Sequence, residues 1–331
     1  MYGNTNVCGC GNKYPIVPGS NPSLVIWNGQ EFVVADGTIQ LPINLPYIQH
    51  TDISQVAYFL TTTPQGVLSK LKNLIGGNIT YLLVGGGGAN GDSAAGVAGG
   101  GGGGGVLTST IPLKTSGLVI NVTVGSGGIA PISNSGAVGG NGGNSIISYK
   151  SISIVSYGGG GGGGNLPTKG ANGSSGGGGG YSLTGGTASQ GHNGSSGGYD
   201  IYSAGYGGGG GGAGTAGTAV SYDGNGNTIG GGGGNGIVSS ITGTSIYYGA
   251  GGGGNADNDG TTITVNGGLG YGNYGSGSKT KAYSSNVAGF GGVCILSIPN
   301  QYFSGIYTNA SVTLNGTNTI LTFTQNGTYT T

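Results

Sequence analysis

Charged residues are scarce in this sequence. Its 331 residues include eight acidic and eight basic ones, and because every basic residue is a lysine, arginine is absent. Nucleic-acid binding needs several cations that neutralise phosphates, and arginine–glycine RNA-binding tails need arginine. We therefore expect no nucleic-acid partner.

Cysteine is scarcer still, with Cys8, Cys10 and Cys294 as the three examples. An odd, sparse set argues against the disulfide framework of a small secreted domain. A structural zinc site needs four ligands at known spacings, whereas His50 and His192 lie far from Cys8 and Cys10. We expect no metal site here, and Cys8 and Cys10 are candidates for a crosslink between subunits.

Long apolar segments are missing too. Runs such as Leu24–Trp27 and Tyr81–Val84 are far shorter than the roughly 20 residues that a membrane-spanning helix needs. The N-terminus has neither the basic nor the apolar segment of a secretory signal. The sequence predicts no membrane span, and synthesis in a cytosol without a signal peptide.

Motifs that would indicate catalysis are absent or lack their context. There is no Gly-Lys pair for a phosphate-binding loop, and G-x-S-x-G occurs only in Gly/Ser stretches at Gly173–Gly177 and Gly194–Gly198. Asp257 and Asp259 are the one close acidic pair, which we interpret as a solvated turn. We expect no enzyme activity and no cofactor.

Glycine is what the chain has in excess, at 87 residues, together with 20 tyrosines. A glycine run can form a left-handed extended helix with three residues per turn, whose N–H and C=O groups all point outward. Such helices can satisfy one another laterally where no side chain intervenes. The long runs that predict this packing begin at Gly85, Gly99, Gly158, Gly176, Gly207, Gly230 and Gly251.

The composition divides the chain into four parts and predicts a mostly β fold with polyglycine II-type segments and very little helix. We expect residues 1–22 to be an extended arm that docks on a neighbouring subunit or on the larger assembly, and 23–77 to form a small β-hairpin and helix region. Residues 78–291 form the glycine-rich domain, and 292–331 supply the C-terminal strands that close it. In the second part we expect a two-residue turn at Asn28-Gly29 and a helix over Pro64–Gly77.

Three local expectations follow from this fold. The β-rich segments Ile79–Val84 and Val293–Ile298 should share a sheet and so close the glycine-rich segment. The runs Gly158–Gly164 and Gly207–Gly212 should be buried, extended and laterally hydrogen-bonded, so that valine at Gly161 or Gly209 blocks folding. Ser175 should be exposed and tolerate valine.

The order of these segments resembles a known family. A strand leads into a glycine run in NITYLLVGGGGANGD (Asn78–Asp92), and GGGGGGGVLTSTIPL, LVINVTVGSGG and GGNGGNSIIS follow. GFGGVCILSIPNQY and LTFTQNGTYTT then resemble its closing strands. This order is similar to that of the glycine-rich domain of phage tail fibres and giant-virus structural proteins, and more loosely to the polyglycine adhesins of T-even-like phages.

The resemblance implies a non-enzymatic virion structural or fibre protein at the virion surface, with itself and other virion proteins as partners. Host surface glycans are the expected ligands, bound by loops in which tyrosine supplies rigid contact area and Ser, Gly and Asn supply hydrogen bonds. The alternative is a cellular glycine-rich structural protein of an extracellular filament or wall. The candidate ligand-binding residues are Tyr199, Tyr202, Tyr206, Tyr247, Tyr248, Tyr271 and Tyr274.

Overall fold

The chain divides into two compact units, Met1–Gly77 and Asn78–Thr331. The computed structural model describes the backbone of residues 25–27, 32–34 and 40–41 in the first unit. From the start of β4 onward it describes residues 77–93, 97–113, 117–166, 168–199, 205–222, 228–255, 266–280 and 286–331. The expected arm (1–22), with Cys8 and Cys10, and residues 64–76 of the expected helix lie outside this description.

The described part of the first unit is a three-stranded antiparallel sheet. It contains β1 (Val25–Trp27), β2 (Phe32–Val34) and β3 (Gln40–Leu41) in that order. Strands β1 and β2 pair antiparallel as predicted, with Trp27 opposite Phe32. The expected two-residue turn at Asn28-Gly29 lies outside the described residues.

The second unit contains two five-stranded sheets that enclose an apolar core. One has the order β17-β18-β15-β4-β5, and the other β16-β19-β6-β7-β8. The first sheet comprises β4 (Gly77–Val84), β5 (Val106–Leu113), β15 (Val293–Pro299), β17 (Ser311–Asn315) and β18 (Asn318–Phe323). The second comprises β6 (Val119–Thr123), β7 (Ser145–Tyr149), β8 (Ile152–Ser156), β16 (Ile306–Thr308) and β19 (Gly327–Thr330).

Side chains on the two faces of β4 belong to two different apolar clusters. Ile79, Tyr81 and Leu83 point into the main core, together with Ile120 and Tyr329 of the facing sheet. On the opposite face of β4, Leu82 and Val84 form a second cluster, which also contains Tyr248. The hairpin of β13 (Ile237–Ser239) and β14 (Ile246–Tyr248) packs on this second cluster.

The predicted closure of the domain is confirmed. Strand β15 pairs antiparallel with β4, with Val293 opposite Val84 and Leu296 opposite Tyr81. Two segments more than 200 residues apart in the sequence thus hold the two ends of the glycine-rich segment together. The sole helix of the described residues is a single 3-10 turn, Asn300–Tyr302, so the nearly all-β prediction is also confirmed.

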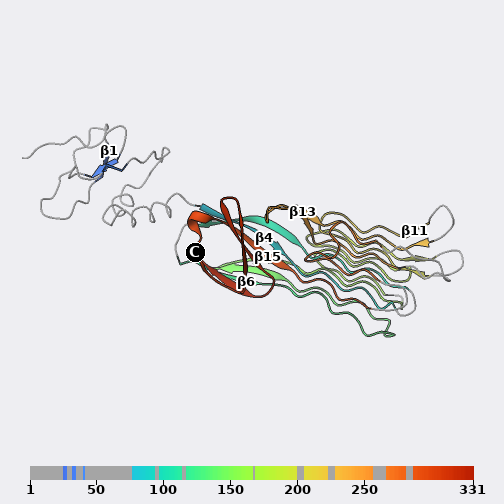
Figure 1. Cartoon of the computed structure of the whole chain (residues 1–331). Helices are drawn as coiled ribbons and strands as arrows, with labels where there is room; N and C mark the ends of the chain where they lie inside the picture. The colour runs from blue at the N-terminus through green and yellow to red at the C-terminus, as the bar shows by residue number, and fades with distance from the viewer. Residues whose placement is uncertain are drawn as a thin grey trace, which may run out of the picture. The chain divides into compact units, whose positions relative to one another are not determined.

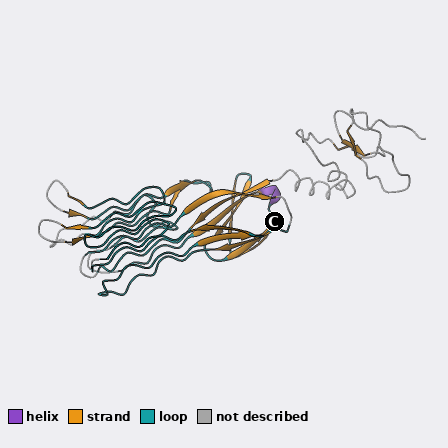
Figure 2. Cartoon of the chain, turned by 180° about the vertical axis from the view of Figure 1, so that it is seen from behind, coloured by secondary structure: helices purple, strands orange, loops and turns teal. Residues whose placement is uncertain are grey.

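Glycine-rich runs leave these sheets, extend away and return many times. In Figure 1 the labels β4, β6 and β15 lie at one end of the second unit, and the runs extend from there towards β11 (Ser221–Tyr222). Figure 2 shows the same division as strands at one end and parallel extended segments at the other. The short strands β9 (Gly198–Tyr199), β10 (Gly205–Tyr206) and β12 (Thr228–Ile229) complete the strands of this unit. We refer to each extended run as a glycine rod.

The rod formed by residues 99–105 shows how the rods pack. Every third N–H donates to the same neighbouring rod, as a helix with three residues per turn requires. Gly99, Gly102 and Gly105 donate to Gly163, Gly160 and Tyr157; Gly100 and Gly103 donate to Gly208 and Gly211; Gly101 and Gly104 donate to Ser278 and Gly275. The donor–acceptor distances are 2.8–3.1 Å, so these are ordinary hydrogen bonds.

The carbonyl groups of this rod are used in the same way by other rods. Gly85, Gly88 and Gly91 donate to it at three-residue intervals, while Gly178 and Gly252 donate from two further rods. The backbone of a central rod is therefore hydrogen-bonded on all sides by backbone. This pairing satisfies buried polar groups without any apolar side chain.

The two glycine runs singled out from the sequence behave as predicted. Residues 158–164 and 207–212 are buried throughout, and most of their amides donate to neighbouring rods. A β-carbon at Gly161 would overlap the carbonyl oxygen of Gly139, and one at Gly209 would overlap that of Gly232. The expectation for Ser175 is wrong, because this residue is fully buried and its N–H donates to Gly103.

Candidate functional site

The candidate tyrosines whose side chains the structure describes fall into two groups at different ends of the rods. Tyr206 immediately precedes Gly207, which is bonded to Asn255 at the end of the rods away from the sheets. Tyr247, Tyr248, Tyr271 and Tyr274 lie instead where the rods join the sheets. Tyr202 and the side chain of Tyr199 are outside the described structure.

Two of these tyrosines are too deeply buried to form part of an exposed contact surface. Tyr206 and Tyr248 are each 1 % exposed, and Tyr248 belongs to the second apolar cluster. Their rings pack in the interior, so the expectation that they bind a ligand at the surface is corrected. Burial also raises the pKa of the Tyr248 phenol above its usual value, because water no longer solvates the charged form.

Tyr271 is half-buried and held by three contacts. Its ring lies edge-on to Phe290, with centroids 5.7 Å apart, and the Lys279 ammonium lies 5.3 Å from the ring centroid. The Lys279 backbone N–H donates to the phenol oxygen at 3.4 Å. Burial raises the pKa of Tyr271, and this hydrogen bond opposes the shift.

Tyr247 and Tyr274 are the two exposed members of the group, at 37 % and 40 %. Two hydrogen bonds bring their segments together, since the Asn273 side-chain Nδ2 donates to the Tyr247 carbonyl at 3.0 Å and the Gly249 N–H donates to the Tyr274 carbonyl at 3.1 Å. Beside Tyr274 is a hollow of about 480 Å³ that Tyr274, Asn273 and Phe290 help to line, whereas Tyr247 is not among its lining residues. Sequence segments 25 residues apart thus form one surface.

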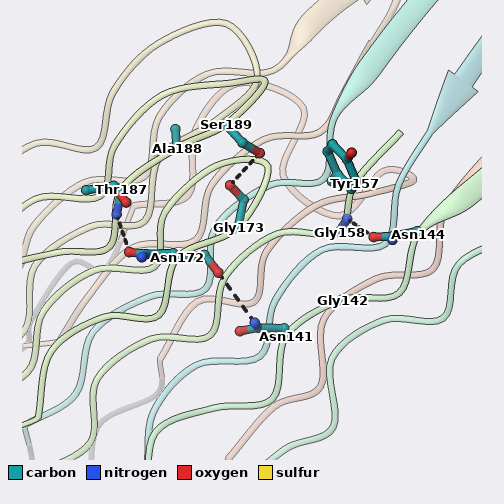
Figure 3. Close-up of a pocket in the computed structure, with 10 residues that line it drawn as sticks. All are labelled: Asn141, Gly142, Asn144, Tyr157, Gly158, Asn172, Gly173, Thr187, Ala188 and Ser189. Atoms are coloured by element: carbon teal, nitrogen blue, oxygen red, sulfur yellow. Dashed lines mark hydrogen bonds between the residues drawn. The ribbon is translucent and has the colours of Figure 1, made fainter. Parts of the chain in front are cut away.

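A second concave surface, a groove of about 590 Å³, lies on the side of the rods. Its lining comes from several neighbouring rods and is drawn in Figure 3, with Asn141, Asn144, Asn172, Tyr157 and Thr187 among its residues. The sequence analysis did not identify this groove. The spacing of Asn141 and Asn144 could have indicated it, because residues three apart lie on the same side of a helix with three residues per turn.

The asparagine oxygens in this groove replace backbone acceptors. Asn144 Oδ1 accepts the Gly158 N–H at 3.0 Å, and Asn141 Oδ1 accepts the Gly161 N–H at 2.9 Å. Asn172 Oδ1 accepts the Thr187 N–H at 2.8 Å. These asparagine side chains lie at the edge of the rod packing. There the backbone N–H groups have no further rod beside them whose carbonyl oxygen could accept their hydrogen bonds.

Within the described residues, no group of three or more His, Cys, Asp and Glu side chains could hold a metal ion. Asp257, Asp259 and His50 are outside the described ranges. Cys294 lies in the main core, and burial raises the pKa of its thiol far above the usual range. None of the described helices is long and apolar enough to cross a membrane.

Comparison with known families and proteins assigns the glycine-rich segment to a family. Residues 66–299 match the sequence model of a family described as a glycine-rich domain. Among curated proteins, none matches the chain. The match extends over the rods and over β4 to β15, and it covers well over half of the sequence. The chain therefore belongs to the glycine-rich domain family.

Proposed function

We propose that this protein is a non-enzymatic structural protein of a virion, a surface or tail fibre whose exposed loops adhere to host glycans. The observation that carries the proposal is the backbone packing around the rod of residues 99–105. The interior around this rod is built mainly from peptide groups. What it provides is a fixed support for the residues at its surface.

Rigidity follows from the hydrogen bonds between rods. To move one central rod sideways, bonds to several neighbours must break together, for example those from Gly102 to Gly160 and from Gly103 to Gly211. The two apolar clusters anchor the rods at the sheet end. A support of this kind suits a protein that holds a recognition surface at a fixed position on a particle.

Recognition then depends on the surface that joins rods and sheets. Tyr247 and Tyr274 present large amphipathic side chains near Asn273, and the hollow beside Tyr274 is lined by no charged residue. Aromatic rings with amide and hydroxyl groups bind neutral polar ligands by stacking and hydrogen bonding. Host surface glycans have this chemistry.

Assembly involves copies of this chain and other virion proteins in the same proposal. Residues 1–22 act as the arm that docks on a neighbour, and Cys8 and Cys10 crosslink that contact once the particle meets oxidising surroundings. Deletion of residues 1–22 should leave a folded protein that no longer assembles. Native assembly by the truncated chain would contradict this role for the arm.

Immunogold labelling of particles and of cells tests the location. Labelling on virion fibres is the expected result, and labelling confined to cell-wall or extracellular filaments would overturn it in favour of a cellular structural protein. Adhesion is tested by the double substitution Tyr247→Ser and Tyr274→Ser in the full chain. We expect loss of binding to host cells with an unchanged melting temperature.

Tyr307→Ser is the matched control, because Tyr307 is also 37 % exposed but lies on β16. If the control loses adhesion as fully as the double variant, the surface around Tyr247 and Tyr274 has no special role. If the double variant adheres normally, recognition does not use these tyrosines.

A further inference from the structure

The geometry points to a second glycan-binding site, the groove of Figure 3, in which Asn144 and Asn172 donate hydrogen bonds to a neutral carbohydrate that stacks on Tyr157. This inference rests on the proposed function and gives it a specific site. The groove is on the side of the rods and is separate from the surface around Tyr247 and Tyr274.

The orientation of the three asparagine amides is determined by the rods. Each Oδ1 accepts a backbone N–H, from Gly158, Gly161 or Thr187, at 2.8–3.0 Å. An amide whose oxygen is held in this way must direct its NH₂ group elsewhere. The rods therefore fix both ends of each amide before any ligand arrives, which lowers the entropic cost of binding.

Two of these NH₂ groups are available to a ligand. Asn141 Nδ2 donates to the Asn172 carbonyl at 3.4 Å, whereas Nδ2 of Asn144 and of Asn172 donates to no acceptor in the described structure. Both residues are exposed. The groove thus presents fixed donors, and a ligand must bring acceptor oxygens to meet them.

The lining also limits the charge of the ligand. No acidic or basic side chain lines the groove, where the residues other than Tyr157 are Asn, Gly, Thr, Ala and Ser. A phosphate, sulfate or carboxylate would find no cation to offset its loss of water. Uncharged hydroxyl and ring oxygens lose less hydration free energy when they are buried. The groove therefore favours a neutral sugar.

Tyr157 supplies the apolar contact that a sugar ring needs. Its side chain is 45 % exposed, and its backbone is fixed at both ends, since its N–H donates to Gln190 Oε1 at 2.8 Å and its carbonyl accepts the Gly105 N–H at 2.9 Å. In Figure 3 Tyr157 lies near Asn144, while Asn172 and Thr187 lie at the other side of the groove. An aromatic face at one side and donors along the groove suit a chain of sugars.

The experiment uses variants that keep the rods intact. Asn144→Asp and Asn172→Asp retain the Oδ acceptor for Gly158 and Thr187 but replace the NH₂ donor. Asn235→Asp is the matched control, because Asn235 Oδ1 accepts the Leu269 N–H at 2.9 Å in the same way outside this groove. Tyr157→Ala removes the ring, and Tyr157→Phe restores it.

The full-length protein is first applied to an array of neutral, sialylated and sulfated glycans, and the best-bound neutral glycan is then titrated by calorimetry. We expect binding to neutral glycans, about tenfold weaker for each of Asn144→Asp and Asn172→Asp, since one hydrogen bond corresponds to roughly that factor. Tyr157→Ala should weaken binding similarly, Tyr157→Phe should recover it, and Asn235→Asp should bind like wild type.

Four results would overturn the inference. If wild type and both groove variants bind with equal affinity, the groove is not a glycan-binding site. Glycan adhesion through Tyr247 and Tyr274 would remain compatible with that result. Equal weakening by Asn235→Asp shows that the added charge, and not the lost donor, is responsible. If the protein binds only charged glycans, the groove is not a site for neutral glycans. If it binds no glycan on the array, both the groove site and the glycan part of the proposed function are wrong.

Discussion

A β-carbon on Gly161 would overlap the carbonyl oxygen of Gly139 in the neighbouring rod. The atom in the way belongs to the backbone, so no rotation of a side chain can make room. We expect Gly161→Ala to lower the free energy of unfolding by about 3 kcal/mol or more, as severe overpacking does. Thermal denaturation should show a melting temperature lower by roughly 6–12 °C.

Gly291→Ala is the control for this substitution. A β-carbon there would have Gly125 O as its nearest neighbour, at 3.9 Å, which is an ordinary van der Waals contact. Its melting temperature should equal that of wild type or rise slightly, since alanine restricts the unfolded chain. Equal stability of the two variants would contradict the packing of the rods.

The Ser145 hydroxyl connects strands and rods, because it donates to the Val84 carbonyl at 2.6 Å and accepts the Gly125 N–H at 2.9 Å. Ser145→Ala leaves both buried groups without this partner and should cost about 1–3 kcal/mol in urea denaturation. Ser311→Ala, at an exposed strand residue, should change stability by less than about 0.5 kcal/mol. A neutral Ser145→Ala would mean that another group takes over both hydrogen bonds.

The two sheets should respond to mutation like an ordinary hydrophobic core. Leu296 is fully buried between its neighbours in the main cluster, whereas Leu314 is 76 % exposed. Leu296→Ala should lower the free energy of unfolding by about 2–5 kcal/mol through lost burial and a cavity. Leu314→Ala should be nearly neutral, and a similar loss in both variants would contradict the assigned core.

Stability should fall at alkaline pH because of Cys294. Burial raises the pKa of this thiol in the folded protein above the unfolded value of about 8.5, so the folded state keeps its proton when the unfolded state loses it. The stability that is present below about pH 8.5 should therefore decrease as the pH rises further. Tyr81, Tyr248 and Tyr271, whose pKa values are also raised, add to the decrease above about pH 10.

Urea denaturation at pH 7 to 10 measures this effect. Cys294→Ala should flatten the decrease between pH 8.5 and 10, although it lowers stability at every pH because it leaves a cavity. Iodoacetamide at pH 8 should leave Cys294 unmodified in the folded protein and alkylate it in urea, as peptide mass spectrometry would show. Rapid alkylation of folded protein would contradict its burial.

The sequence predicted those features that depend on glycine and on strand patterns. Lateral bonding of residues 158–164 followed from the absence of side chains, and the pairing of β4 with β15 followed from two β-rich segments at the ends of the glycine-rich part. Which tyrosines face solvent could not be predicted. Tyr247 and Tyr248 are adjacent in sequence, yet alternation along β14 exposes the first and buries the second.

Ser175 shows a second limit of the sequence. Serine in a glycine-rich stretch is typical of a solvent-exposed loop, but this residue lies inside the packing because its rod has neighbours such as Gly103 on that side. The groove at Asn144 and Asn172 is another such case, since it depends on which rods lie side by side. Both facts come from contacts between distant segments, which composition and spacing do not contain.

The three-residue repeat of the rods has a consequence for how the gene can change. Removing one codon from the rod of residues 99–105 would turn every later N–H by a third of a turn, so that the Gly102 N–H, which donates to Gly160, would face the rod of Ser278 instead. Removing three codons shortens the rod by one turn, about 9 Å, and returns each later donor to its original neighbour. Insertions and deletions inside a rod are therefore tolerable only in multiples of nine nucleotides, whereas the connecting loops carry no such restriction.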